Sequence, residues 1–234
     1  MLQNKYQDQL FKINDKTYGF IKWNWNYDEA LLFQEEARQY IAENRDLKIF
    51  IFTSHPRLFT LGRGLQKSKS EDTKALINFD ESMEKRLPFP LYRIKRGGGL
   101  TFHYPGQWIM YPIVNLNHPG HSLKELIYFM LENVKVTIEE HYHLTELDYN
   151  RQLLGLWKEQ HKLASVGIEI KKFITQHGLA LNVKKDLEMF KELRNVNPCG
   201  LSSDIYRSME DYLNEEIHLE EFTNKFLKTI SDRN

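Results

Sequence analysis

The chain has little cysteine and no net charge. A single cysteine among 234 residues rules out an intramolecular disulfide and a zinc site made of four sulfurs. Lys and Arg together number 32, as do Asp and Glu, so the formal net charge is zero and no bulk field favours nucleic acid or an anionic membrane. The cysteine content fits a reducing compartment, and we expect neither nucleic acid nor a membrane as a partner.

Long apolar segments are missing as well. No stretch approaches the ~18–20 apolar residues of a membrane span. The first residues, MLQNKYQDQLFKIND, show neither the apolar core of a secretion signal nor an Arg-rich transit peptide. We therefore expect a cytoplasmic protein. Internal repeats and low-complexity linkers are absent too, and the length favours a single domain over residues 1–234.

Helical periodicity marks three parts of the chain. Apolar residues between positions 30 and 41 fall on one stripe and predict a helix that begins near Asp28. Ser122 stands three positions before Glu125, which predicts a capping box at the start of a second helix. The buried stripe expected for that helix consists of Leu123, Leu126, Ile127, Met130, Leu131, Val134 and Ile138. A third, amphipathic helix is expected at about residues 216–231.

Strand patterns lie between the predicted helices. Residues 47–54 form a run of β-branched and aromatic side chains, which is typical of a buried strand. Further β-like segments are expected at residues 91–95 and 107–116. Between residues 162 and 183 apolar side chains recur with period two, which predicts two strands separated by a corner at Gln176–Gly178.

The remaining segments are polar. Residues 66–85 are charged and weakly periodic, so we expect a solvated surface loop with at most one helical turn, and a polar link precedes Lys162. Helices and strands together predict an α+β fold, with a mixed, largely antiparallel sheet flanked by helices.

The segment from Arg93 to Gln107 has the most unusual composition. Its three consecutive glycines allow a backbone to approach a ligand closely and expose N–H groups, while Arg96 supplies a charge and His103 a titratable donor. It is not a nucleotide-binding P-loop, because the Gly-Lys-Ser/Thr ending is missing. On the residues alone, a tight connection between two strands is an equally good interpretation.

Two further residues are candidates for catalysis. Cys199 lies in an Asn-Pro-Cys-Gly segment, where Pro198 fixes the local direction and Gly200 frees space, so the thiol could be presented at the tip of a loop. A buried, inert cysteine is the alternative. Lys162 is followed by small residues that leave room for a pocket, although a lysine at the start of a strand is often simply solvated. The nine histidines show no third ligand at recognisable spacing, so no metal site is expected.

Taken together, five blocks between about residues 47 and 201 resemble the lipoyl(octanoyl) transferases. The blocks are His55-Pro56 with Phe59–Arg63, Arg96–His103 with Pro105–Gln107, Lys162–Gly167, His177–Val183 and Asn197–Gly200, in the order of the family. The resemblance implies the catalytic fold shared with biotin and lipoate protein ligases. It also implies transfer of an octanoyl (or lipoyl) group from acyl-carrier protein. The acceptor would be a lysine on a lipoyl domain of a 2-oxoacid dehydrogenase complex or on the glycine-cleavage carrier protein.

The resemblance also implies roles for individual residues. Cys199 would be the nucleophile that accepts the acyl group, and Lys162 the neighbour that lowers the pKa of its thiol. The expected substrate contacts are Arg96, Gly97, Gly98, Gly99, Leu100, Thr101, Phe102, His103, Ser165, Val166, Gly167, Gly178, Leu179 and Ala180. Groups that bind the oxyanion or orient the substrate stay open among His103, His177 and Gly200. A thioester is already activated, so neither a cofactor nor a metal is implied.

Some positions depart from the family pattern. Tyr104 stands where the family usually has glycine, and its phenol is expected to narrow or re-aim the pocket. Gly64 and the run Leu201–Ser203 also differ, but neither removes a group on which the mechanism depends.

Two other functions are compatible with the sequence. One is an ATP-dependent protein ligase of the lipoate or biotin type, in which the strand lysine helps to form an acyl-adenylate and no cysteine is needed. The other is a non-catalytic module that binds a carrier protein, in which Cys199 and Lys162 lie apart. Cys199 in its Asn-Pro-Cys-Gly setting favours the transferase.

Overall fold

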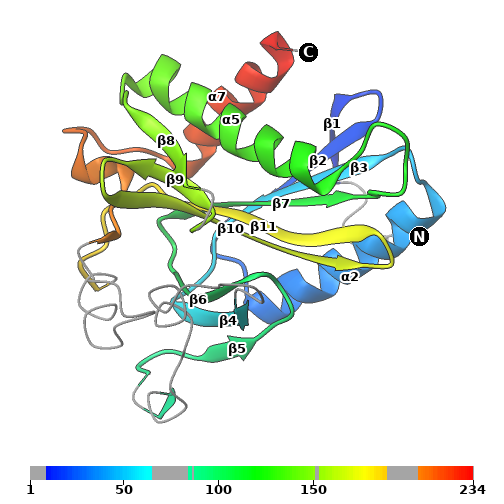
Figure 1. The fold of residues 1–234 in the computed structure, drawn as a ribbon, viewed down its shortest axis with the longest axis horizontal. Coiled ribbons are helices and arrows are strands. Elements are labelled where there is room, and N and C mark those ends of the chain that lie inside the picture. Colours follow the sequence, from blue (N-terminus) through cyan, green and yellow to red (C-terminus); the bar gives the residue numbers. More distant parts are fainter. Residues whose placement is uncertain (1–8, 65–83, 86, 151–152, 189–204, 234) are drawn as a thin grey trace.

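The large sheet of the protein is its middle layer. A computed structural model describes residues 9–64, 84–85, 87–150, 153–188 and 205–233. The eight-stranded sheet has the order β1-β2-β3-β7-β11-β10-β9-β8, and a three-stranded sheet with the order β5-β4-β6 lies beside it (Figure 1). All pairs of the large sheet are antiparallel except β2 with β3, and in the small sheet β4 and β5 are parallel. The predicted mixed, largely antiparallel sheet is therefore confirmed.

The elements have the following bounds. The strands of the large sheet are β1 (Phe11–Asn14), β2 (Thr17–Lys22), β3 (Lys48–Thr53), β7 (Gln107–Val114), β8 (Leu147–Asn150), β9 (Gly155–Lys158), β10 (His161–Lys171) and β11 (Ile174–Asn182). Those of the small sheet are β4 (Leu58–Gly64), β5 (Leu91–Arg93) and β6 (Gly98–His103). The helices are α2 (Tyr27–Glu43), α5 (Leu123–Tyr142), α7 (Leu219–Asp232) and the short 3-10 helix η3 (Met209–Asp211).

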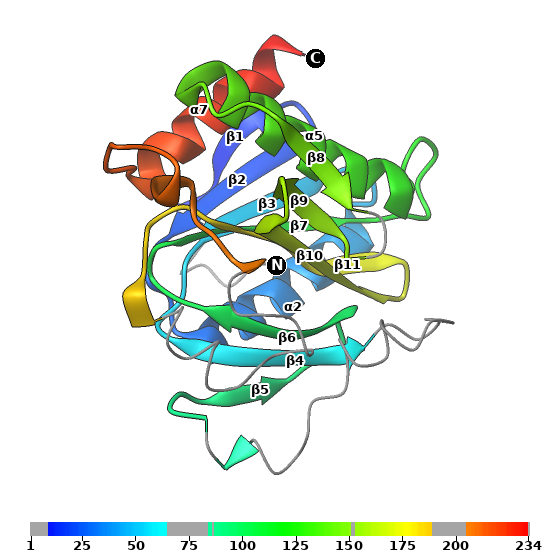
Figure 2. The same cartoon turned by 60° about the vertical axis from the view of Figure 1, so that its left-hand side comes forward.

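Both faces of the large sheet are covered. Helices α5 and α7 pack on one face, whereas α2 and the small sheet lie on the other (Figures 1 and 2). Strand β7 is consequently buried along its whole length. Trp108 on β7 faces the α5 and α7 side, where its indole N–H donates a hydrogen bond of 2.8 Å to Thr223 of α7. Ile109 and Tyr111 face the α2 side, as the period of two in a strand requires.

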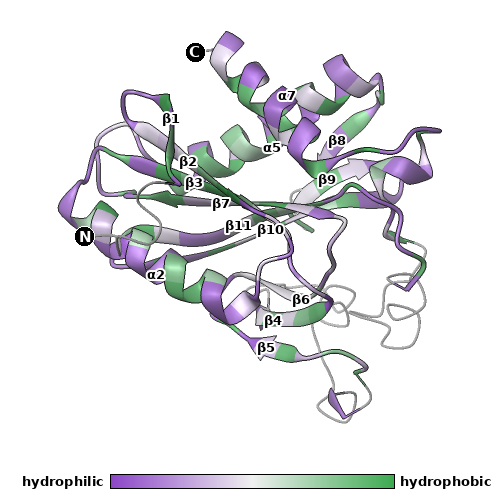
Figure 3. Cartoon of the chain, turned by 180° about the vertical axis from the view of Figure 1, so that it is seen from behind, coloured by the Kyte–Doolittle hydropathy of each residue, from purple (hydrophilic) through white to green (hydrophobic). Residues whose placement is uncertain are grey.

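Helices α2 and α5 begin where the sequence predicts, whereas α7 begins at Leu219, later than the predicted start near residue 216. The Ser122 side chain accepts a hydrogen bond of 3.2 Å from the backbone N–H of Glu125 and so caps α5. Helix α2 is capped in the same way by Asn26, and hydrophobic and hydrophilic residues alternate along its ribbon (Figure 3). Its residues Ala30, Phe33, Ala37 and Ile41 are buried in one cluster with residues of β3 and β7. The buried stripe predicted for α5 is confirmed except at its beginning, where Leu123 and Ile127 are only partly buried.

Several strands have no counterpart in the sequence prediction. They are β1, β2, β4, β6, β8 and β9. The expected polar link before Lys162 is occupied by β8 and β9, and Gly98 and Gly99 begin β6 instead of forming a connection. The predicted loop at residues 66–85 lies outside the described residues except for Glu84 and Lys85.

The corner predicted at Gln176–Gly178 is wrong, because these residues lie inside β11. The chain turns instead at Lys172 and Phe173, whose φ angles of 51° and 65° are those of a tight two-residue hairpin. His177 also has a positive φ, of 60°, within the strand. Its backbone N–H therefore leaves the sheet ladder and donates to the side-chain oxygen of Gln34 on α2, at 2.8 Å.

The small sheet packs closely because glycine is present on β4. A Cβ placed on Gly62 would lie 2.3 Å from the carbonyl oxygen of Gly98 and 2.8 Å from that of Arg96. Both distances are too short for carbon and backbone oxygen, so any side chain here would push the segment Arg96–Gly98 away from β4. Gly97 lies next to this contact but has room for a methyl group, since its nearest neighbour would be 3.9 Å away.

We predict that Gly62→Ala lowers the free energy of unfolding by about 2 kcal/mol, because the backbone of the neighbouring strand must shift to relieve the overlap. Gly97→Ala is the matched control, with an expected change below about 1 kcal/mol. Urea unfolding monitored by tryptophan fluorescence measures both. Equal effects of the two substitutions would contradict the packing described for Gly62.

Candidate active site

A cavity of about 290 Å³ lies between the small sheet, β10, β11 and the start of α5. Its lining comprises Tyr27, Ile94, Arg96, Gly97, Gly98, Gly99, Leu100, Thr101, His103, Tyr111, Leu123, Ile127, Leu153, Leu154, Lys162, Ser165, Val166, Gly167, Ile168, His177, Gly178, Leu179, Ala180 and Tyr206. The described residues form three hydrophobic clusters: one between the large sheet and helices α5 and α7, one between the large sheet and α2, and one on the small sheet. Residues from each cluster line the cavity, so the cavity lies where the clusters meet.

The structure brings nearly all of the predicted substrate contacts into this cavity. Every one of them lines it except Phe102, and so do Lys162 and His177. Alternate side chains of β6 point to opposite sides, which directs Phe102 into a cluster with Phe59, at 5.0 Å between ring centroids. The predicted nucleophile Cys199, together with Gly200, lies outside the described residues.

Tyr104 does not narrow the cavity. Its ring is fully buried beside Phe102 and does not contribute to the cavity wall. Its hydroxyl donates a hydrogen bond of 2.9 Å to the carbonyl oxygen of Lys184. The Tyr104 ring therefore packs against Phe102, and its hydroxyl binds the backbone of Lys184. The prediction that Tyr104 narrows the pocket is wrong.

Lys162 enters the cavity from a distorted part of β10. The pairing of β10 with β9 shifts between Lys162 and Ala164, and Tyr206 forms a parallel bridge with Lys162 on the backbone. The ammonium lies 5.5 Å from the centre of the Trp157 ring, within the range of a cation–π contact. A Cβ on Gly155 would come within 2.8 Å of the lysine Cε, so glycine at this position leaves space for the lysine side chain.

Arg96 holds the cavity wall together. The residue is buried, and one terminal nitrogen donates to the Thr60 carbonyl at 3.0 Å, the Thr60 hydroxyl at 2.8 Å and the Thr101 hydroxyl at 2.8 Å. The other terminal nitrogen donates to the carbonyl of Gly97 at 2.7 Å. The backbone N–H of Gly97 donates to Ile168 of β10 at 3.1 Å, which fastens the small sheet to the large one. The sequence suggested that the glycine triplet exposes its N–H groups to a ligand. The N–H of Gly97 is instead used to join the two sheets.

His103 is held as a neutral ring with a defined tautomer. Gln107 uses its amide nitrogen as donor to the Phe102 carbonyl and to Asn182, so its oxygen accepts from Nδ1 of His103 at 2.6 Å. Nε2 of His103 is then the acceptor for the Thr60 hydroxyl, at 3.0 Å. Burial, with His55 and Arg96 nearby, lowers the pKa of His103 well below its ordinary value. With both nitrogens engaged, the ring is suited to orient Thr60 rather than to bind an oxyanion.

His55 and His177 are neutral for the same reason. Burial lowers the pKa of His55 to about 4 and that of His177 to about 3. Nδ1 of His55 donates to the Trp25 carbonyl at 2.8 Å, and its Nε2 accepts from the Tyr111 hydroxyl at 2.9 Å. Burial likewise raises the pKa of Tyr27, so its hydroxyl stays protonated at neutral pH. The polar side of the cavity thus presents the Arg96 cation among neutral rings.

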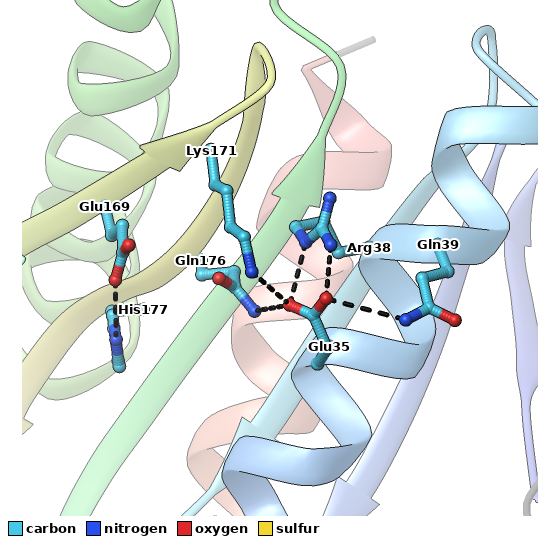
Figure 4. Close-up of polar contacts among 7 residues, drawn as sticks. All are labelled: Glu35, Arg38, Gln39, Glu169, Lys171, Gln176 and His177. Carbon is cyan, nitrogen blue, oxygen red and sulfur yellow. Dashed lines mark hydrogen bonds and ion pairs between the residues drawn. The ribbon is translucent and has the colours of Figure 1, made fainter. Parts of the chain in front are cut away.

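Two separate groups of polar side chains lie near this side of the cavity, His177 with Glu169 and Glu35 with its partners on α2 and the β10–β11 hairpin (Figure 4). Nε2 of His177 lies 3.9 Å from a carboxylate oxygen of Glu169, but a neutral imidazole at that distance makes no ion pair. Glu35 on α2 receives hydrogen bonds from Arg38, and this lowers the pKa of Glu35 to about 2. Lys171, 3.4 Å from the Glu35 carboxylate, ties the hairpin to the helix.

None of the helices in the described part of the chain is long and apolar enough to cross a membrane. Within the same residues, no group of three His, Cys, Asp or Glu side chains is arranged to hold a metal ion.

Several cavity residues were not identified as functional from the sequence. Leu123 and Ile127 carry an apolar helical pattern, which looks the same whether it faces a core or a cavity. Tyr27 and Tyr111 belong to a helix and a buried strand with no local motif. Tyr206 reaches the cavity through its bridge to β10, a long-range contact that no local spacing reveals.

Comparison with known families shows to which family the chain belongs. Over residues 24–231 the sequence matches the family described as the lipoyl protein ligase A/B catalytic domain. The chain belongs to this family. The match includes every residue that lines the cavity, and it confirms the resemblance seen in the sequence blocks.

Curated relatives that resemble this chain are octanoyltransferases. That of Synechococcus elongatus is 34% identical over 188 residues, which cover 80% of this chain and 74% of the relative. That of Christiangramia forsetii is 31% identical over 224 residues, with 90% of each chain covered. The chloroplastic octanoyltransferase of Arabidopsis thaliana is 31% identical over 201 residues, covering 85% of this chain and 65% of the plant protein.

Solved structures of lipoate protein ligases share the fold of this protein. A bipartite lipoate protein ligase from Thermoplasma acidophilum, studied with its E2 lipoyl domain, matches with a TM-score of 0.62 and 15% identity over 94% of this chain and 84% of that one. Lipoate-protein ligase A bound with ATP matches with a TM-score of 0.60 and 14% identity, covering 93% and 84%. The predicted ligase-like α+β fold is confirmed.

The buried neutral histidines predict loss of stability in acid. The pKa of His55 falls from 6.5 in an exposed state to about 4 in the folded protein, so the unfolded chain takes up a proton first as the pH falls. The stabilisation is complete above about pH 6.5 and is lost progressively toward pH 4. Between pH 7 and pH 5 this histidine accounts for about 2 kcal/mol of the lost stability.

Urea unfolding of the wild type and of His55→Gln at pH 7, 6 and 5 measures this contribution. We predict that the variant is less stable at pH 7 but loses about 2 kcal/mol less on acidification. His118→Gln is the control, because that side chain is only partly buried and does not line the cavity; this variant is expected to keep the slope of the wild type. A His55 variant with the slope of the wild type would show that His55 is not the titrating group.

Proposed function

We propose that the protein transfers an octanoyl (or lipoyl) group from acyl-carrier protein to a lysine of a lipoyl domain, through a thioester on Cys199. The observation that carries the proposal is the cavity itself. It gathers residues from three separate sequence blocks, Arg96–His103, Lys162–Gly167 and Gly178–Ala180, around one apolar space. The relatives over most of the chain are octanoyltransferases, which supports the same conclusion.

The position of Tyr206 supports the assignment of Cys199. Tyr206 lines the cavity, bridges to Lys162 and follows Cys199 by seven positions. Seven residues span at most about 25 Å when fully extended. Asp186, which precedes Cys199 in the chain, is tied to Arg57 by an ion pair of 2.7 Å.

The proposed reaction has two steps. The Cys199 thiolate attacks the carbonyl carbon of the donor thioester; the bond to the carrier sulfur breaks, and the leaving carrier thiolate takes up a proton from the Lys162 ammonium, which leaves Lys162 neutral. The neutral acceptor amine then attacks the Cys199 thioester, forms an amide and releases the Cys199 thiolate. A nearby Lys162 ammonium stabilises that thiolate before the first step, and neutral Lys162 serves as the base for the acceptor amine in the second.

The chemistry needs no nucleotide in this scheme. Both donor and intermediate are thioesters, so the acyl carbon is already activated when the amine attacks. Lipoyl domains of 2-oxoacid dehydrogenase complexes or of the glycine-cleavage carrier are the proposed acceptors, because a flexible exposed lysine must enter the cavity. Arg96 is engaged by Thr60, Thr101 and Gly97 and acts as a fixed part of the wall.

Intact mass spectrometry tests the covalent step. The wild type is mixed with octanoyl-acyl-carrier protein without ATP, and apo lipoyl domain is then added. We expect one octanoyl adduct on Cys199, which disappears as the lipoyl domain gains the same mass. Cys199→Ser should lower transfer at least about 100-fold, since a hydroxyl is a much weaker nucleophile at neutral pH. Transfer by Cys199→Ser at the rate of the wild type would contradict the acyl-enzyme.

The same experiment separates the rival functions. Modification of the lipoyl domain by free octanoate plus ATP, with no adduct from the thioester donor, would establish an ATP-dependent ligase. Tight binding of the carrier protein without any transfer would establish a binding module. Either result would overturn the proposed transferase.

Lys162 is predicted to act in both steps. Lys162→Ala should slow adduct formation and transfer about 100-fold, because it removes both the stabilising charge and the base. Lys158→Ala is the matched control: Lys158 is also a strand lysine, but it bonds to Thr145 and Glu146 and does not line the cavity. Single-turnover transfer measured for both variants decides the assignment, and equal rates would remove Lys162 from the mechanism.

A further inference from the structure

Strand β11 places most of its side chains on alternate faces of the large sheet, as a regular strand does. Gln176 reaches Glu35 of α2, and Ala180 belongs to the hydrophobic cluster between the sheet and α2, so the even-numbered positions face that helix. Leu179 belongs to the cluster under α5 and α7 and represents the odd-numbered positions. The alternation therefore predicts that the side chain of His177 points toward α5.

The His177 ring lies on the α2 side instead. It meets the ring of Tyr111 edge to face, with 6.0 Å between the centroids, and its Nε2 lies 3.9 Å from Glu169 (Figure 4). Tyr111 belongs to the cluster on the α2 side, whereas Ile168, the backbone partner of His177, packs against the cluster under α5 and α7. The φ angle of 60° at His177 accounts for the reversal, because an irregular residue within a strand re-aims its side chain.

Gln34 of α2 holds His177 in this conformation. A positive φ is unfavourable for a residue with a Cβ and persists only where neighbouring groups stabilise it. The side-chain oxygen of Gln34 accepts a hydrogen bond from the backbone N–H of His177 at 2.8 Å. The Gln34 side chain is buried, and its amide nitrogen has no hydrogen-bond partner among the described residues. Since an unpaired buried N–H is unfavourable, glutamine at this position is explained by its oxygen and by the bond to His177.

The imidazole of His177 is a free hydrogen-bonding group of the cavity lining. Its side chain is 6% exposed, and within the described part of the chain neither ring nitrogen makes a hydrogen bond. His103 and His55 differ, because both nitrogens of each ring are engaged by neighbouring residues. A neutral imidazole offers one donor and one acceptor, and buried polar groups are normally paired. A molecule bound in the cavity can supply the missing partner.

We propose that Gln34 is a positioning residue, which directs the imidazole of His177 into the cavity, where the ring forms a hydrogen bond with the bound acyl donor. The proposal rests on the acyl transfer proposed above and adds to it a residue that does not itself line the cavity. Without the Gln34 oxygen, the backbone N–H of His177 loses its partner and the positive φ loses its support. The ring then returns to the α5 side, which regular alternation assigns to it.

Gln34→Met removes the oxygen and keeps the length of the side chain. We expect the KM for octanoyl-acyl-carrier protein to rise about tenfold and kcat to change by less than about twofold, because a contact made in the ground state is lost. A purely structural defect reduces the amount of folded enzyme, which lowers kcat and leaves KM unchanged. Gln34→Glu keeps an oxygen acceptor and should hold KM within about threefold of the wild type. Gln39→Met is the matched control and should leave KM unchanged, because Gln39 is exposed on the same helix.

A double-mutant cycle shows whether Gln34 acts through His177. His177→Asn removes the imidazole but keeps the backbone N–H, and asparagine adopts a positive φ more readily than most residues. We expect this variant alone to raise KM about tenfold, and Gln34→Met to add no further change in its presence. Multiplying effects, or an unchanged KM in His177→Asn or in folded Gln34→Met, would overturn the proposal. The His177 variant keeps the test decisive if Gln34→Met does not fold.

Crystal structures of the wild type and of Gln34→Met test the positioning without reference to activity. We expect the ring of His177 to leave Tyr111 in the variant, and its φ to become negative as in an ordinary strand. A ring that keeps its contact with Tyr111 would overturn the role of Gln34. Absence of transfer by the wild type would overturn the proposed function instead, while the two crystal structures still decide whether Gln34 positions His177.

Discussion

The hydrogen bond from the Gly97 N–H to the Ile168 carbonyl is the contact on which the site depends. It joins the small sheet to β10 of the large sheet, and the cavity is the space enclosed by that junction. The junction is reinforced by Arg96, whose guanidinium binds Thr60 and Thr101 on adjacent strands. Glycine at Gly62 and Gly167 lets the backbone come this close, since a Cβ at either place would overlap the segment Arg96–Gly98.

Burial of Arg96 determines the charge of its surroundings. A buried cation is costly unless it is fully hydrogen-bonded, and the threonine hydroxyls and backbone carbonyls around Arg96 meet that need without a titratable group. Placing further positive charges nearby would be unfavourable, which is one reason why the pKa values of His103 and His177 are lowered. The histidines therefore serve as neutral hydrogen-bonding rings, and the chain of contacts from Arg96 through Thr60 to His103 and Gln107 has one consistent set of donors and acceptors.

Much of the fold was predictable where a local rule determines it. The start of α5 follows from one capping serine, and the buried stripe of α5 from apolar spacing. The hairpin was not predictable, because Lys172 and Phe173 carry none of the glycine or asparagine expected for positive φ, whereas Gly178 looks like a turn residue and serves strand packing instead. Strand β9 is stabilised by pairing with β10, and β8 by pairing with β9, and neither strand has a sequence pattern of its own.

The sequence predicted which residues form the site better than it predicted how they are arranged. Resemblance between blocks indicated which segments meet, but neither the turn of Phe102 away from the cavity nor the role of Tyr104 in the small-sheet cluster is visible without the strand register. Apolar residues on α5 could not be divided between core and cavity either, because both environments select the same side chains.

A scaffold shared with ATP-dependent ligases does not by itself determine how the acyl group is activated. Forming an adenylate requires a site that tolerates the charge of a nucleotide triphosphate, whereas a thioester donor brings an acyl carbon that is already activated. Among the described residues that line the cavity, Arg96 and Lys162 are basic, and Arg96 is bound by the cavity wall. Lys162 lies beside the Trp157 ring on the large sheet. These two side chains are compatible with either way of activating the acyl carbon, so the scaffold and its charges do not distinguish a transferase from a ligase. The similarity to octanoyltransferases over most of the chain is the reason why a thioester donor is proposed.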